Sequence, residues 1–282
     1  MIKEKNEVKI MSEPKQLYLC LISDSVGETA FKLTQAAMAQ FPEIKPFYER
    51  FPFVNSTDKI DELLKIAQEK NAIITHTLVT QGLSEYLQVQ AANLGIVAID
   101  LITPVVRSVS KRFDLQPTHE AGALHHLTEK YFDRISAMEF AVLYDDGKDP
   151  RGFLEADVIL LGISRTSKTP ISLFLANRNI KVANLPIVPQ AHIPEELYQV
   201  DPKKIIGLTN DPQVLNNIRR QRMIAYGLNP DTTYSDMDAI KSELAFAQDL
   251  YKKLGCYVIN VANRSIEETA TLILEHLGLD HY

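Results

Sequence analysis

The sequence predicts an α/β protein with two parallel-sheet domains, and three observations support this prediction. The chain has 282 residues, roughly the length of two average domains. Short apolar segments alternate with segments of helical periodicity, which is typical of βαβ units and parallel sheets. The composition, 45% hydrophobic and 23% charged, is that of a globular protein and excludes a disordered or disulfide-scaffold chain.

The first domain is expected over residues 14–145 and includes a helical connector. Its first strand leads into a polar loop in which Ser25 is followed by Glu28, the spacing of a capping box at a helix start. The expected strands are 17–22, 46–54, 72–79 and 95–101. One helix is expected to follow the polar loop and end near Gln40, and two more are expected at 57–70 and 81–93. The helical connector covers 120–144.

The second domain is expected over residues 150–282, after the turn-rich stretch 145–150. It alternates strands and helices in the manner of a P-loop kinase-like α/β domain, and no sequence repeat links it to the first domain. Its strands are expected at 156–161, 181–185, 203–208 and 257–261, and its helices at 168–177, 212–226, 236–254 and 265–277.

Charge and cysteine content limit the kinds of binding partner and indicate the cellular compartment of the protein. Acidic residues number 36 against 30 lysines and arginines, and the excess acid lies in the N-terminal half. Such a balance excludes a general nucleic-acid binder but leaves room for a local cationic pocket. Cys20 and Cys256 are expected to be free thiols in a reducing compartment. Since no segment resembles a membrane span or a secretory signal, we expect a cytoplasmic protein without a membrane partner.

The segment Gly162–Thr169 carries the clearest chemical signal. An apolar strand delivers Gly162, and Lys168 and Thr169 follow at the spacing of the G-x-x-x-x-G-K-[ST] phosphate loop. In such a loop, backbone N–H groups and the N-terminus of the next helix surround a phosphate. Lys168 would neutralise the terminal phosphate oxygens, and the Thr169 hydroxyl would hold Mg²⁺. Ser167 stands where the second glycine of the motif belongs, and serine enters the left-handed conformation at some cost.

Each of these assignments has a plainer alternative. The loop could be an ordinary polar connection in which Thr166 or Ser167 caps the helix. Asp211 ends a strand, where a carboxylate could orient a metal ion, but Asp211-Pro212 also suits a helix N-terminus. Arg219 and Arg222 share a helix face and could clamp a transferred phosphoryl group, or they could belong to a solvated basic face.

Beyond the phosphate loop, a set of ordered motifs resembles the pyruvate, phosphate dikinase regulatory proteins. The resemblance covers about residues 16–277 without large gaps, and Gly162–Pro170 is close to the signature of that family, including its serine at position 167. The matching segments are Ser23–Ala30, Tyr131–Ile135, Glu139-Phe140, Asp145–Gly147, Ala156–Pro170, Lys181–Pro186, Gly207–Thr209, Ile218-Arg219, Arg222 and Val258–Glu268.

The resemblance implies an unusual pair of reactions. Members of the family phosphorylate a threonine of the dikinase with ADP as donor, once the nearby catalytic histidine of the dikinase carries phosphate. They reverse the modification with inorganic phosphate as acceptor and release pyrophosphate. The form of the first motif resembles the dikinase branch more than the branch acting on phosphoenolpyruvate synthase. A homodimer is a further possibility. The loop that would bind ADP consists of Gly162, Ile163, Ser164, Arg165, Thr166, Ser167, Lys168 and Thr169.

Three candidates for the catalytic base precede this loop in sequence. They are Asp145, Asp146 and His126, and the sequence does not separate the two aspartates from each other or from an ordinary acidic turn. The phosphorolytic direction needs an anion site, for which Arg165, Arg219 and Arg222 are candidates. Two other functions stay open: an ATP-dependent small-molecule P-loop kinase, and a nucleotide sensor that acts by contact alone.

Overall fold

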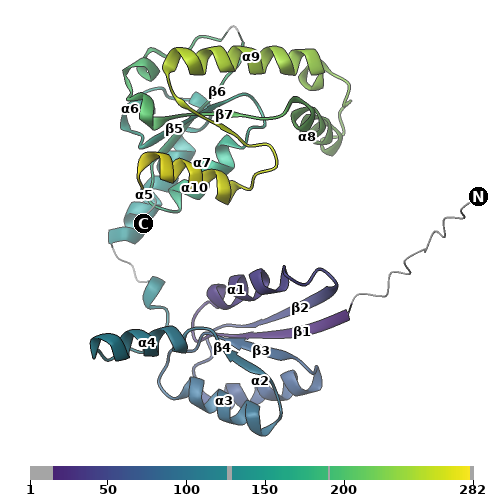
Figure 1. Cartoon of the computed structure of the whole chain (residues 1–282), viewed down its shortest axis with the longest axis vertical. Helices are drawn as coiled ribbons and strands as arrows, with labels where there is room; N and C mark the ends of the chain where they lie inside the picture. The colour runs from purple at the N-terminus through teal and green to yellow at the C-terminus, as the bar shows by residue number, and fades with distance from the viewer. Residues whose placement is uncertain (1–14, 126–128, 190, 280–282) are drawn as a thin grey trace, which may run out of the picture. The chain divides into compact units, whose positions relative to one another are not determined.

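The computed structural model of the chain describes residues 15–125, 129–189 and 191–279, and these residues form two units. Contacts between residues divide the chain into residues 1–126 and 127–282, and each unit contains a four-stranded parallel sheet (Figure 1). The predicted α/β class is therefore confirmed. None of the helices in the described ranges is long and apolar enough to cross a bilayer.

The first unit has the strand order β2-β1-β3-β4. Cys20 and Ile22 of β1 and Ile74 of β3 pack beneath α2 and α3, while α1 lies on the opposite face of the sheet (Figure 1). Its elements are β1 (Lys15–Ile22), α1 (Glu28–Met38), β2 (Ile44–Phe51), α2 (Thr57–Glu69), β3 (Ile73–His76), α3 (Leu83–Asn93), β4 (Ala98–Asp100) and α4 (Thr103–Phe113).

The second unit has the corresponding order β6-β5-β7-β8. Alternate residues of β5 enter two apolar clusters because successive strand side chains point to opposite faces. Ile159 and Leu161 pack toward α9, whereas Val158 and Leu160 pack toward α7 and α10 (Figure 1). Its main elements are α5 (Glu129–Leu143), α6 (Gly152–Glu155), β5 (Val158–Gly162), α7 (Lys168–Ala176), β6 (Val182–Pro186), β7 (Ile205–Thr209), α8 (Pro212–Ala225), α9 (Met237–Leu254), β8 (Tyr257–Asn260) and α10 (Ile266–Leu277).

The structure differs from the sequence prediction at two helices. The connector assigned to the first domain contains α5, but Ala137 and Ala141 of this helix pack against Ala176 of α7 in the second unit. The boundary expected at residues 145–150 therefore lies inside that unit. Helix α4 was not predicted, although Val105, Val109 and Phe113 recur at helical spacing along it; none of its residues is buried.

The two helix starts that carry a serine and a glutamate behave differently. Ser265 and Glu268 form a reciprocal capping box at α10. The capping box predicted for Ser25 and Glu28 is wrong, because Gly27 occupies the N-cap position in the left-handed conformation at φ 77°. The Glu28 carboxylate instead pairs with Arg50 at 3.1 Å.

Candidate active site

The predicted phosphate loop connects β5 to α7 at the carboxyl end of the second sheet. Gly162 is required here because a Cβ at this position would lie 2.3 Å from Thr166 Oγ1. Thr166 in turn donates a hydrogen bond to the Ile163 carbonyl at 2.9 Å and closes the loop from within. Ser167 adopts the left-handed conformation at φ 63°, as expected for a residue in the place of the second glycine. Ser167 occupies the N-cap position of α7, as the plainer alternative expects, but its side chain makes no capping hydrogen bond.

Lys168 is the first residue of α7, and its side chain folds back under the loop. The amine Nζ donates to the carbonyl oxygens of Gly162 at 3.0 Å and of Ile163 at 3.2 Å. The residue is only 6% exposed. Burial lowers the pKa of this amine to about 8, although the negative charges of Asp146 and Asp145 oppose the shift.

The turn formed by Asp145–Gly147 places one carboxylate beside the start of α7. Asp145 Oδ1 accepts hydrogen bonds from Thr169 Oγ1 at 2.9 Å and from Asn184 Nδ2 at 2.6 Å. Asn184 is fully buried on β6, and its side-chain oxygen accepts from the Asp146 backbone N–H at 3.1 Å. This asparagine was missed in the sequence, where it reads as an ordinary strand residue. It fixes the acidic turn to the sheet next to the phosphate loop.

Asp146 differs from its neighbour in conformation and in hydrogen bonding. Its backbone is left-handed, with φ 57° and ψ 29°, and the residue is exposed. Within the described residues its carboxylate accepts no hydrogen bond, yet its charge is the strongest influence opposing the pKa shift of Lys168. Gly147 completes the turn at φ 67°, where a Cβ would meet Leu185 Cδ1 at 2.5 Å. The turn therefore presents Asp146 to solvent close to the buried amine.

A second group of side chains supports the outer half of the loop from α8 and α9. Arg219 is fully buried and donates to Glu243 Oε2 at 2.6 Å, to the Ser164 carbonyl at 3.2 Å and to the Tyr234 carbonyl at 2.9 Å. The Tyr234 hydroxyl lies 3.0 Å from Ser164 Oγ and accepts from Arg165 Nε at 3.1 Å. Tyr234 and Glu243 carry no motif, so sequence reasoning missed them.

The remaining predicted residues do not take the roles that the sequence suggested. Because the Arg219 guanidinium is engaged beneath Ser164, its geometry favours a positioning role over the expected phosphate contact. Arg222 is exposed and stacks on the ring of Tyr226 at 4.6 Å, away from Arg219. Asp211 caps α8 by accepting from two backbone N–H groups, which confirms the plain helix-start alternative. His126 lies outside the described residues.

Comparison with known proteins gives full-length similarity. Residues 19–274 match the family model described as kinase/pyrophosphorylase. The chain is 66% identical over 270 residues to a pyruvate, phosphate dikinase regulatory protein 1 of Latilactobacillus sakei, covering 96% of each chain. It is 60% identical over 268 residues to a protein named as such a regulator in Lacticaseibacillus casei, covering 95% of this chain and 97% of the other. A similarly named protein of Lactobacillus helveticus is 60% identical over 271 residues.

Proposed function

The chain belongs to the kinase/pyrophosphorylase family, and we propose that it regulates pyruvate, phosphate dikinase by reversible phosphorylation of a threonine. ADP is the donor in one direction, and inorganic phosphate is the acceptor in the other. The observation that carries the proposal is a buried loop lysine, Lys168, at the start of α7, next to the turn that exposes the Asp146 carboxylate. A cation for phosphate and a free base for a hydroxyl are what phosphoryl transfer to threonine requires.

In the kinase direction, the threonine hydroxyl oxygen attacks the β-phosphorus of ADP. The bond from this phosphorus to the bridging oxygen breaks, AMP leaves, and the hydroxyl proton passes to the Asp146 carboxylate. We assign the base to Asp146 over Asp145 because Asp145 Oδ1 already accepts from Thr169 and Asn184. A base must have a lone pair available toward the substrate.

In the phosphorylase direction, an oxygen of inorganic phosphate attacks the phosphorus of phosphothreonine. The bond to the threonine oxygen breaks and pyrophosphate leaves, while the proton that inorganic phosphate gives up passes through the Asp146 carboxylate to the threonine oxygen. Lys168 Nζ would balance the charge on the transferred group in both directions, and the N–H groups at the start of α7 would add to this field. The network of Arg219, Tyr234 and Glu243 would hold Ser164 and Arg165 in place.

The residues beside Lys168 also fit Mg²⁺, which prefers hard oxygen ligands and keeps several waters and substrate phosphates. Thr169 Oγ1 donates its proton to Asp145, so its lone pairs are directed away from that carboxylate. Thr169 and Asp145 would hold the ion, which would supply further charge neutralisation at the diphosphate.

The test is incubation of the chain with ADP and a dikinase in its phosphohistidine form. We expect phosphothreonine on the dikinase and AMP in solution, and release of pyrophosphate when the modified dikinase is returned with inorganic phosphate. Asp146→Asn should slow both reactions by roughly 100-fold or more, whereas Asp149→Asn, three positions along and paired with Arg151, should not.

Two outcomes would replace this proposal. Turnover of ATP with a small molecule and no protein substrate would indicate the small-molecule kinase. Inhibition of the dikinase that persists unchanged in Lys168→Ala, without phosphothreonine, would indicate a sensor that acts by contact.

A further inference from the structure

Helix α4 carries an apolar stripe that the rest of the first unit leaves exposed, apart from the Arg112 guanidinium, which lies 5.8 Å from the centre of the Phe113 ring. Val105, Val109 and Phe113 recur every four residues and are 64%, 50% and 62% exposed. None of the 11 residues of the helix is buried. Helices of this length are marginal in water without tertiary packing, so a partner surface would add to the stabilisation that the first unit supplies.

The same helix is a local concentration of positive charge in an acidic chain. Arg107, Lys111 and Arg112 lie within it, it contains no acidic residue, and the whole chain has a net charge of −6. None of the three cations forms an ion pair with a described residue. At 100° per residue, Arg112 borders the apolar stripe, and Lys111 lies on the exposed side of the helix beyond Arg112. Arg107 instead lines a neighbouring cavity.

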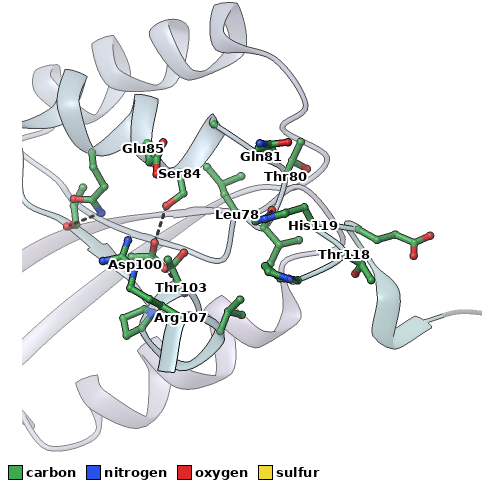
Figure 2. A pocket seen from close by; sticks show the side chains of 18 of the residues that line it. Leu78, Thr80, Gln81, Ser84, Glu85, Asp100, Thr103, Arg107, Thr118 and His119 are labelled. Carbon is green, nitrogen blue, oxygen red and sulfur yellow. Dashed lines mark hydrogen bonds between the residues drawn. The ribbon is translucent and has the colours of Figure 1, made fainter. Parts of the chain in front are cut away.

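That cavity, of about 1150 Å³, lies between α4, α3 and β4, and no residue of the apolar stripe lines it. Figure 2 shows Thr103 and Arg107 on the α4 side and Ser84 and Glu85 on the α3 side. Asp100 anchors the start of α4: its Oδ1 accepts from the backbone N–H groups of Ile102 and Thr103, and its Oδ2 accepts from Ser84 at 2.6 Å. The first turn is therefore fixed, while the stripe continues outward.

We propose that the exposed side of α4 forms a docking surface for a protein segment in which carboxylates border apolar side chains. The identity of that protein as the dikinase rests on the proposed function; the surface itself does not. Lys111 and Arg112, which form no ion pair within the described part of the first unit, favour an acidic partner. Pairing of α4 with α4 of a second copy would bring like charges together, and three apolar side chains give little area for insertion into a bilayer.

The test measures binding of the full chain to a dikinase without nucleotide, and then the KM and kcat for dikinase phosphorylation. Val109→Ser with Phe113→Ser, and separately Lys111→Glu with Arg112→Glu, should each weaken binding about tenfold or more and raise KM with little change in kcat. The charge variant should also flatten the salt dependence of binding. Because these side chains are exposed, the thermal unfolding of both variants should match the wild type.

Matched controls come from other exposed positions of the same unit. Leu33→Ser on α1 and Lys65→Glu on α2 should leave binding unchanged. The docking proposal fails if the α4 variants bind as tightly as the wild type, or if the wild type forms no complex with the dikinase. It also fails if sedimentation shows a dimer that the α4 variants dissociate, or if α4-dependent binding to phosphatidylserine vesicles appears instead.

The docking surface and the proposed function can fail separately. Tight α4-dependent binding without phosphothreonine would leave the docking surface standing and refute the reaction. Phosphorylation of the dikinase with an unchanged KM in the α4 variants would support the reaction and refute the docking surface.

Discussion

The two units share a strand order but place opposite charges at equivalent positions. In both sheets the first strand of the unit lies second in order, so its carboxyl end adjoins the point where the chain direction switches from one side of the sheet to the other. The loop after β1 contains Asp24, and no lysine or arginine occurs between residues 23 and 29. The loop after β5 leads to Lys168.

Asp24 and Lys168 also form different kinds of hydrogen bonds. Asp24 is 8% exposed, and its Oδ2 accepts from the backbone N–H groups of Val79 and Thr80 at 2.8 and 2.7 Å, so the first unit ties its own loops together. Lys168 bonds only to carbonyls of its own loop and leaves cationic character near the helix start. The topology determines where a crevice lies, and individual side chains determine which charge it accepts.

Removing Lys168 should abolish the positive charge that distinguishes the loop after β5 from the loop after β1. We expect Lys168→Ala to reduce phosphoryl transfer in both directions by at least about 1,000-fold, because the transferred phosphoryl loses its main side-chain cation. Phosphothreonine formation and pyrophosphate release measure the effect. Lys148→Ala, an exposed lysine near the same turn, is the control; equal losses in the two variants would contradict the role of Lys168.

The next largest effect concerns Arg219, which supports the loop from below and should contribute to the stability of the second unit. Arg219→Ala should lower the free energy of unfolding by about 3 kcal/mol, since Glu243 and the carbonyls of Ser164 and Tyr234 lose their partner. Denaturant titration measures this, and ADP affinity should fall with it. Arg222→Ala, on the exposed part of the same helix, should change stability by less than about 0.5 kcal/mol. If Arg222→Ala loses more ADP affinity than Arg219→Ala does, Arg222 contacts the phosphate directly, as the sequence predicted.

The equivalent substitution in the first unit should affect stability but leave nucleotide binding intact. Asp24→Ala should cost about 2 kcal/mol of unfolding free energy, because the N–H groups of Val79 and Thr80 lose their acceptor. ADP affinity, measured by calorimetry, should not move. Glu43→Ala, an exposed carboxylate of the same unit, is the control. Loss of ADP binding in Asp24→Ala would break the contrast between the two units.

The smallest effect concerns pH. Lys168 has a folded-state pKa of about 8, below its ordinary value of 10.5, so the unfolded chain binds more protons between these values. Its contribution to stability therefore rises with pH across this window, while the charge needed for phosphate is lost above about pH 8. ADP affinity should fall about tenfold from pH 7 to pH 9. Lys168→Arg, which stays charged, should show no such decline; a parallel decline would assign the titration to another group.

The sequence predicted most elements because parallel strands and amphipathic helices leave periodic patterns. It indicated the loop between β5 and α7 as a candidate phosphate loop because Gly162, Lys168 and Thr169 lie within one short segment of the chain. It did not find Asn184, Tyr234 or Glu243, since these reach the loop only through strand pairing and helix packing. It also could not separate Asp145 from Asp146: the difference lies in a left-handed backbone and in the hydrogen bonds that Thr169 and Asn184 donate to only one of them.

The apolar clusters described for the two units share no residue within the described ranges. Free-energy changes from substitutions in different units should therefore be additive to within about 0.5 kcal/mol, as for Ile74 in the first and Leu160 in the second. Substitutions at Leu160 and Leu175, which belong to one cluster, should instead be coupled. Stabilising changes could thus be selected in each unit separately and then combined.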